Sequence, residues 1–276
     1  MKTVASFNHA DIQIYKFGFA PFGKPRMFSH LYFVDGLLID TGQSNMRRET
    51  MAAIDSLPVD QLFVTHYHED HTGNLAAVQQ RFNPPCYASA LCIELMRSPP
   101  KISPAQWLTW GDRPPNTQLV AADREIATAR YRFELIPIPG HAADMVGLYE
   151  ATQGWFFSAD LWVSSHIRYF VYNESMNGQI ESLKRALRLD FDVLLCGHRP
   201  QFKGGKEKLR QKLQFLEDFY GQVATLHHAG HSARSVMAQM ALKESWKIRL
   251  LSLGALSMLN MVKSVIRDEN SHEQTT

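Results

Sequence analysis

The segment VTHYHEDHTGN, residues 64 to 74, constrains the chain most, because it places three histidines and an aspartate within six positions. The apolar run before it, QLFVT, predicts a buried strand. In an extended segment alternate side chains point the same way, so His66 and His68 can converge on one point. Asp70 and His71 follow after a short turn and can face a second point close by. Imidazole and carboxylate groups suit Zn²⁺, Fe or Mn, and four so close together fit two neighbouring ions better than one.

Three more fragments carry ligand-type side chains at the ends of predicted strands. His141 lies in PIPGHAADMVGLY, Asp160 in FFSADLW and His198 in LLCGHRP. Such strand-to-loop junctions are where open sheets place their binding sites. A solvated loop would explain any single histidine of this group, but it does not explain the whole set. The sequence therefore predicts one shared metal site.

The order of apolar patterns predicts an α/β protein up to about residue 204. Strand-like runs occur at DIQIYKF, HLYFV, LLID, RFELIPI, MVGLYEA, GWFFSA and FDVLLCG, with a turn at Asp35-Gly36. Helical patterns occur near residues 45 to 56 and in NLAAVQQRF and IESLKRALRL. The proline-rich residues 83 to 117 include the helical fragments CIELMR and AQWLTW. We expect this region to lie over a site and not to form part of the sheet.

After Gly204-Gly205 the pattern changes to helix, in KEKLRQKLQFLEDFYGQV, SARSVMAQMALKES and the apolar residues 248 to 266. Polar residues interrupt that last stretch along one helical stripe. This predicts a largely buried helix instead of a membrane span, with an interfacial or dimer-forming helix as the alternative. We expect a catalytic domain at 1–204 and a helical region at 205–276.

Charge and cysteine usage narrow the classes of function. The formal net charge is +2 without a dense Lys/Arg run, which gives no electrostatic footprint for nucleic acid. The three cysteines form neither a disulfide framework nor a CxxC site, and the N-terminus lacks the features of a signal peptide. We expect a cytoplasmic protein without a membrane span.

The ordered set Asp40-Thr41-Gly42, His66-x-His68-x-Asp70-His71, His141, Asp160 and His198 resembles the five-motif signature of the metallo-β-lactamase superfamily, over residues 10 to 202. The resemblance implies an αββα sandwich with the metal site at one edge, here followed by a C-terminal helical extension. It also implies two divalent ions, with Zn²⁺ expected first and Fe or Mn as alternatives. By matched position, the first ion is held by His66, His68 and His141, and the second by Asp70, His71 and His198. Asp160 bridges both, and Asp40 orients the cluster through hydrogen bonds.

The resemblance implies hydrolysis by a hydroxide shared between two ions, because a metal lowers the pKa of bound water from 15.7 to about 7. The second ion or a protonated Asp70 then assists the leaving group. The bridging Asp160 is similar to glyoxalase II, lactonase and nuclease branches, and true β-lactamases lack it. His68 stands where flavodiiron proteins carry glutamate. We expect a small-molecule thioester, ester or lactone as substrate; the alternatives are a phosphodiesterase or nuclease, and a ligand-binding protein with low turnover.

Residues around the motifs supply weaker hypotheses. Substrate contacts are predicted for the residues that follow the bridging aspartate: Trp162, His166, Arg168 and Tyr169. A structural Trp162 and a solvated Arg168 are the alternatives. Trp107 and Trp110 form either an apolar wall or core. The last group, His227, His228 and His231, is expected to be a solvated helix end and not a surface metal site. A homodimer through the C-terminal helices is a further possibility.

Overall fold

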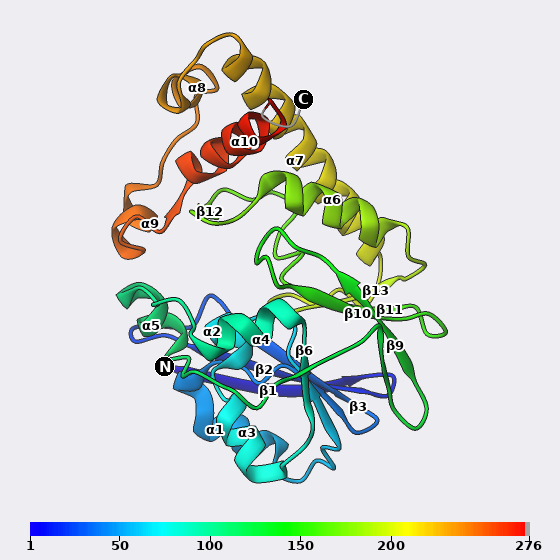
Figure 1. Cartoon of the computed structure of the whole chain (residues 1–276). Helices are drawn as coiled ribbons and strands as arrows, with labels where there is room; N and C mark the ends of the chain where they lie inside the picture. The colour runs from blue at the N-terminus through cyan, green and yellow to red at the C-terminus, as the bar shows by residue number, and fades with distance from the viewer. Residues whose placement is uncertain (274–276) are drawn as a thin grey trace.

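The computed structural model describes residues 1–273 and contains two sheets packed face to face (Figure 1). The first sheet has seven strands in chain order, antiparallel from β1 to β4 and parallel from β4 to β7. Its strands are β1 (Lys2–His9), β2 (Ile12–Phe19), β3 (Ser29–Val34), β4 (Leu37–Ile39), β5 (Gln61–Phe63), β6 (Cys86–Ala88) and β7 (Val120–Ala121).

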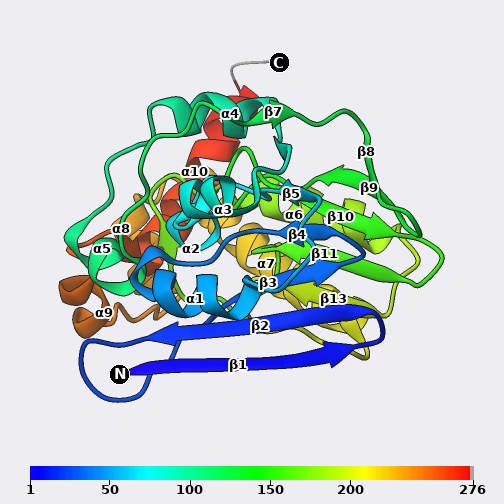
Figure 2. The same cartoon turned by 90° about the horizontal axis from the view of Figure 1, so that it is seen from below.

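The second sheet has five strands in the order β13-β11-β10-β9-β8, with β11 and β13 parallel and the other neighbours antiparallel. These strands are β8 (Glu125–Ala127), β9 (Arg132–Pro137), β10 (Val146–Glu150), β11 (Trp155–Ala159) and β13 (Val193–Cys196). Helices α1 (Arg47–Ile54) and α3 (Leu75–Phe82) lie outside the first sheet, and α6 (Met176–Leu187) and α7 (Gly205–His228) outside the second (Figures 1 and 2). The expected αββα sandwich with C-terminal helices is confirmed.

Alternation along the strands explains this layering. In β2, Ile12 and Ile14 enter the apolar cluster between the sheets, whereas Tyr15 and Phe17 enter the cluster under the helices. In β11, Phe157 faces the other sheet and Phe156 faces the helices. Each large apolar side chain buried in this way contributes about 1.5–3 kcal/mol. Strands buried on both faces thus hold the sandwich together and fix where their ends lie.

The proline-rich region does contribute to the sheet, so that expectation is wrong for part of it. Residues Cys86–Ala88 form β6, which pairs in parallel with β5. Three residues are too few to give a periodic pattern, and the preceding prolines obscure the strand. The helical fragments are confirmed as α4 (Ala90–Arg97) and α5 (Pro104–Trp110).

The apolar stretch 248 to 266 is not one helix, which corrects a second expectation. It is divided among α9 (Trp246–Leu251), β14 (Leu256–Ser257) and α10 (Met258–Glu273). The break occurs where Leu253 and Gly254 adopt φ values of 50° and 82°, outside helical geometry. Burial is correspondingly uneven, since Met261, Val262 and Val265 are buried in α10.

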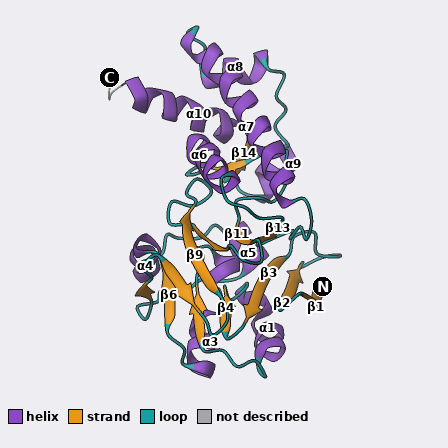
Figure 3. Ribbon diagram, turned by 90° about the vertical axis from the view of Figure 1, so that its right-hand side faces the viewer, coloured by secondary structure: helices purple, strands orange, loops and turns teal. Residues whose placement is uncertain are grey.

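β14 pairs with β12 (Phe170–Val171), and α10 contacts α6, α7 and α8 (Ala233–Gln239) on the side of the second sheet (Figure 3). α7 begins at Gly205, where the sequence predicts the domain boundary. Independent folding of residues 205–276 and dimerisation through these helices stay predictions. Within residues 1–273, no helix combines the length and apolarity that crossing a bilayer requires.

Candidate metal centre

Seven side chains from four loops meet at one edge of the sandwich. Asp40 follows β4 directly, and the histidine motif runs from the end of β5 into the single turn α2 (Glu69–Thr72). His141 lies between β9 and β10, Asp160 follows β11, and His198 follows β13. The structure brings together every ligand predicted from the sequence: His66, His68, Asp70, His71, His141, Asp160 and His198. We call these seven residues the cage.

Three imidazoles form the first group of the cage. His66 Nε2 lies 3.1 Å from His68 Nδ1, and His141 Nε2 lies 3.0 Å from the same His68 nitrogen. All three nitrogens lie within 4.8 Å of one another. These are the residues predicted to hold the first ion.

The second group of the cage combines carboxylates with imidazoles. His198 Nε2 lies 3.0 Å from Asp160 Oδ2 and 3.5 Å from Asp70 Oδ2. His71 Nε2 lies 3.3 Å from Asp160 Oδ1 and 3.6 Å from Asp70 Oδ2, and it also groups with His66. His141 Nε2 is 3.5 Å from Asp160 Oδ2. Asp160 therefore lies between the two groups, as a bridging carboxylate must.

Hydrogen bonds outside the cage orient its imidazoles. Asp40 accepts from Thr65 N and Thr65 Oγ1 at 2.8 and 2.9 Å, and its Oδ2 lies 2.7 Å from His71 Nδ1. The Thr65 hydroxyl, which donates to Asp40, can only accept from His66 Nδ1, 3.1 Å away. His198 Nδ1 donates to the Phe28 carbonyl at 2.8 Å. In each of these three rings Nε2, the nitrogen that can bind a cation, consequently faces the cage.

The cage fits divalent cations. His71 Nε2 and Asp160 Oδ1 are buried and lack a hydrogen-bond partner among the described residues. His68 Nδ1 also lies 3.1 Å from His66 Nε2 and 3.0 Å from His141 Nε2, so three ring nitrogens crowd together. Such an arrangement is unfavourable unless positive charge lies among the acceptor atoms. A donor set of imidazole and carboxylate without thiolate suits Zn²⁺, Fe and Mn.

The electrostatics of the cage favour the ligand form of some side chains and the protonated form of others. Burial, reinforced by the neighbouring His71, holds the pKa of His66 well below its usual range. Burial works to raise the pKa of Asp160, but His198 and His71 hold it well below that of an ordinary carboxyl group. Burial also works to lower the pKa of His198, whereas Asp160 raises it to about 9. His66 is thus neutral and Asp160 ionised, as ligands must be, while His198 must release a proton to bind a cation.

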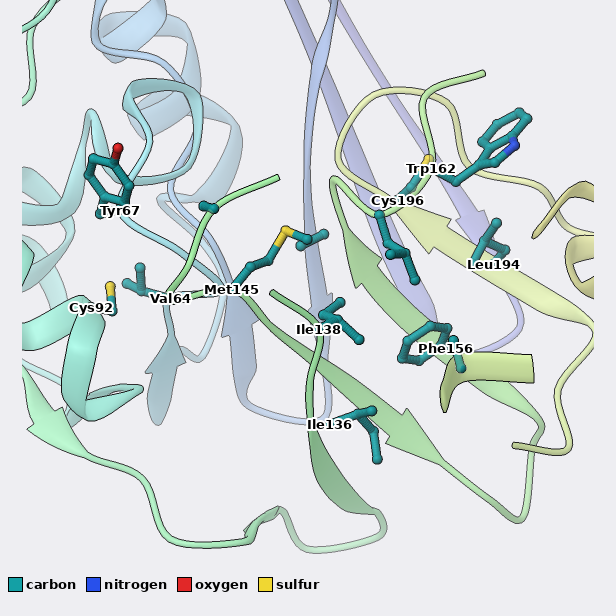
Figure 4. Close-up of a cluster of buried hydrophobic side chains, with 14 of the residues drawn as sticks. Val64, Tyr67, Cys92, Ile136, Ile138, Met145, Phe156, Trp162, Leu194 and Cys196 are labelled. Atoms are coloured by element: carbon teal, nitrogen blue, oxygen red, sulfur yellow. The ribbon is translucent and has the colours of Figure 1, made fainter. Parts of the chain in front are cut away.

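The predicted substrate residues are not brought together as a set. Trp162 is only 4% exposed and lies in the same buried cluster as Phe156, Leu194 and Cys196 (Figure 4). This burial favours the structural alternative for Trp162, and substrate contact by this residue stays a prediction. His166 and Arg168 are exposed, and Tyr169 is half-buried. Substrate contact by these three residues stays a prediction.

Two side chains near the cage have clearer positions than the sequence suggested. Trp110 of α5 is half-buried and stacks on His198, with ring centroids 5.8 Å apart and planes 23° from parallel. Trp107 is 59% exposed, so neither tryptophan belongs to the core. Trp110 thus forms a wall beside the second group.

Sequence reasoning missed Glu174, whose Oε2 lies 3.4 Å from His141 Nδ1. It also missed a buried ion pair within the histidine motif, where Glu69 Oε1 lies 3.3 Å from Arg113 Nη1. Arg113 donates to the Tyr67 carbonyl at 3.1 Å as well. Both carboxylates lie far from their partners in sequence, so no local spacing could have identified them.

The αββα sandwich and the cage at its edge together define the class of protein. It is a sandwich fold that carries a candidate dinuclear metal centre. Residues 26–198 match the family model described as the metallo-beta-lactamase superfamily. Because that match covers more than half of the chain, the protein belongs to this superfamily. Its members are mostly hydrolases.

Curated proteins match parts of the chain, and two of them have named activities. A hydroxyacylglutathione hydrolase from Aeromonas hydrophila is 29% identical over 166 residues, which cover 59% of this chain and 56% of that protein. A ribonuclease Z from Thermococcus onnurineus is 38% identical over 47 residues, covering 17% of this chain and 15% of that protein. The chain thus spans little more than half of the first relative and a small part of the second.

A solved structure extends the likeness of fold into the C-terminal helices. A beta-lactamase domain protein from Burkholderia ambifaria superposes with a TM-score of 0.69 over 93% of this chain and 86% of its own. The sequence identity is 19%. At this identity the comparison establishes the fold alone.

Proposed function

We propose that the protein is a dinuclear metallohydrolase that cleaves a small-molecule thioester, ester or lactone. The observation that carries the proposal is the complete cage, in which Asp160 lies between a three-histidine group and a second group containing Asp70, His71 and His198. Bound divalent ions would supply an acidified water as nucleophile and a Lewis acid for the substrate carbonyl. Zn²⁺ is the first candidate, and Fe or Mn are alternatives.

The chain's own residues would hold the cations, orient the ligands and transfer a proton. Asp160 and the histidines would hold the cations, and Asp40 keeps His71 turned with Nε2 inward. Asp70 Oδ2, which lies 3.5 Å from His198 Nε2, is the proposed proton carrier to the leaving group. Trp110 offers a flat apolar wall beside His198 for part of the substrate.

The substrate class rests on two supports. The relative named hydroxyacylglutathione hydrolase is by its name a hydrolase of an acylated glutathione. The near-neutral charge of the chain offers no footprint for a polyanion. A phosphodiesterase or nuclease activity remains the second candidate because of the short match to ribonuclease Z.

The test combines metal analysis with a panel of thioesters, lactones, aryl esters and bis-aryl phosphodiesters. We expect two ions per chain and turnover of at least one carbonyl substrate. His68→Ala should lose an ion and lower kcat/KM by about 10³-fold or more. His227→Ala, which changes a half-buried histidine outside the cage, is the matched control and should leave both unchanged. Turnover of phosphodiesters alone, or full activity in His68→Ala, would overturn the proposal.

A further inference from the structure

Glu174 is a buried carboxylate on the outer side of the cage. It lies between β12 and α6 with 6% exposure, and its Oε2 is 3.4 Å from His141 Nδ1. The other nitrogen of that ring, Nε2, faces the cage and lies 3.0 Å from His68 Nδ1. Glu174 therefore faces the ring nitrogen that cannot reach a cation in the cage.

Further hydrogen bonds hold the Glu174 carboxylate in this position. Its Oε1 accepts from Val171 N at 2.9 Å, and its Oε2 accepts from Gln179 Nε2 at 2.8 Å. With two neutral donors on the carboxylate, its charge is oriented but not neutralised by a Lys or Arg within ion-pair distance in residues 1–273. The carboxylate can accept a hydrogen bond from a protonated Nδ1 of His141. This leaves the lone pair of the ring on Nε2, which faces the cage.

The C-terminal helix α10 holds the backbone of the same residue. The buried Ser264 hydroxyl donates to the Glu174 carbonyl at 2.9 Å and accepts from Met176 N at 2.8 Å. Arg267 donates through Nη2 to the Glu174 carbonyl at 2.8 Å and through Nη1 to the Tyr172 carbonyl at 2.6 Å. Two side chains of α10 thus fix the segment that carries the carboxylate.

The His141 loop is attached to this segment as well. Ser175 N donates to the Gly140 carbonyl at 2.9 Å, immediately before His141. Gly140 has a φ of 135°, and a Cβ there would collide with the backbone of Gly178 and Gln179. The loop, the start of α6 and α10 therefore form one continuous set of contacts around His141.

We infer that Glu174 is a positioning residue for His141 and that α10, through Ser264 and Arg267, is a working part of the metal centre. The inference rests on the metal site of the proposed function. Carboxylates on the outer nitrogen of a ligating histidine fix its tautomer and raise its basicity, and their loss typically weakens metal affinity about 10- to 100-fold. The C-terminal helices thus set the affinity of the cage in addition to covering the sandwich.

The experiment titrates the metal-free full chain with Co²⁺ in competition with a chelator and records the visible absorption of the bound ion. Glu174→Gln should weaken one of the two Co²⁺ sites by about 10- to 100-fold and change its spectrum, and should leave the other site near its original affinity. Ser264→Ala and Arg267→Met should shift the same site in the same direction by smaller factors. Glu269→Gln is the matched control on α10, since Glu269 contacts His228 and Tyr220 and not the Glu174 segment.

The outcomes separate the two proposals. A wild-type chain that binds no Co²⁺ refutes the metal site of the proposed function. A wild-type chain with two sites, together with a Glu174→Gln variant of unchanged affinity and spectrum, overturns this inference alone. A lower melting temperature without a change in Co²⁺ affinity would assign Glu174 to packing and would also overturn it. Should Glu174→Gln fail to fold, the exposed Arg267 provides the deciding variant, and unchanged Co²⁺ binding in Arg267→Met would overturn the role of α10.

Discussion

The two ends of the sandwich carry similar charged residues in opposite environments. At the cage end, Asp40, Asp70 and Asp160 are each no more than 5% exposed. At the other end, Arg130 bridges Asp11 and Asp35 at 2.8 and 3.2 Å, with its side chain 55% exposed. Exposed pairs of that kind add little stability because water screens them. Buried charges cost desolvation and persist only where they are paired or bind a cation. The difference is what a cation-binding site at the cage end requires, whereas the ion pairs at the other end connect three loops.

The largest effect on metal binding and activity is expected for Asp160→Asn, which removes the charge between the two groups of the cage. We expect loss of metal and a fall in kcat/KM of about 10³-fold or more, because both groups share this carboxylate. Metal content by elemental analysis and steady-state kinetics measure the effect. Asp35→Asn, the equivalent change at the opposite end, should bind metal as the wild type does; a loss there would contradict the contrast.

Asp40→Asn tests the orientation of the cage without removing a ligand. Asparagine tolerates the left-handed backbone at this position, where φ is 63°, so the change acts on the bonds that Oδ2 accepts from His71 Nδ1 and Thr65 Oγ1. We expect about 10- to 100-fold weaker metal binding at the group containing His71. Competition with a chelator measures it, and Asp11→Asn serves as the control. Wild-type affinity in Asp40→Asn would show that His71 needs no orienting carboxylate.

Lys212 is a buried basic side chain, and it tests how burial outside the cage affects a charged group. Its Nζ donates to the Leu161 carbonyl at 2.6 Å, and burial lowers the pKa of this amine to about 8, whereas the unfolded chain should titrate near 10.5. Between these values the unfolded state binds more protons than the folded state, so stability should rise with pH. The gain should approach about 1.4 kcal/mol per pH unit. Urea unfolding at several pH values from 7.5 to 10, in wild type and Lys212→Met, measures this slope; equal slopes in the two proteins would refute it.

The smallest effect is expected for Arg130→Ala at the exposed end. Because Asp11 is half exposed and Asp35 still accepts from the backbone amide of residue 130, the melting temperature should move by less than about 4 °C. Metal content and kcat/KM should not change. A large loss of stability would mean that the exposed network is more than a surface tie.

The ligands of the cage could be predicted because each lies next to a strand whose pattern is visible in the sequence. His66 and His68 follow a buried run at alternating positions, and Asp160 and His198 follow two others. The environment of the cage could not be predicted in this way. Glu174 reaches His141 across 33 positions, and Asp40 reaches His71 across 31, so these contacts follow from the packing of loops and not from a local period.

The fold could likewise be predicted where the sequence carries a local pattern. Long periodic strands and helices were predictable, whereas the three-residue β6 was hidden behind prolines. The break at Gly254 was hidden because a glycine inside an apolar pattern only weakens a helix, and pairing of β14 with β12 decides the outcome.

The parallel neighbours β6 and β7 have a consequence for how the protein can diversify. Residues 89 to 119 leave the sheet after one of these strands and return to it at the other. This segment places Trp110 beside the cage, and its residue Arg113 forms an ion pair with Glu69. Changing the length of such a closed excursion costs little, about 0.6 kcal/mol for each doubling. The stretch from residue 98 to 112 can therefore change in length at little cost in loop closure, while the strands that carry the cage stay as they are.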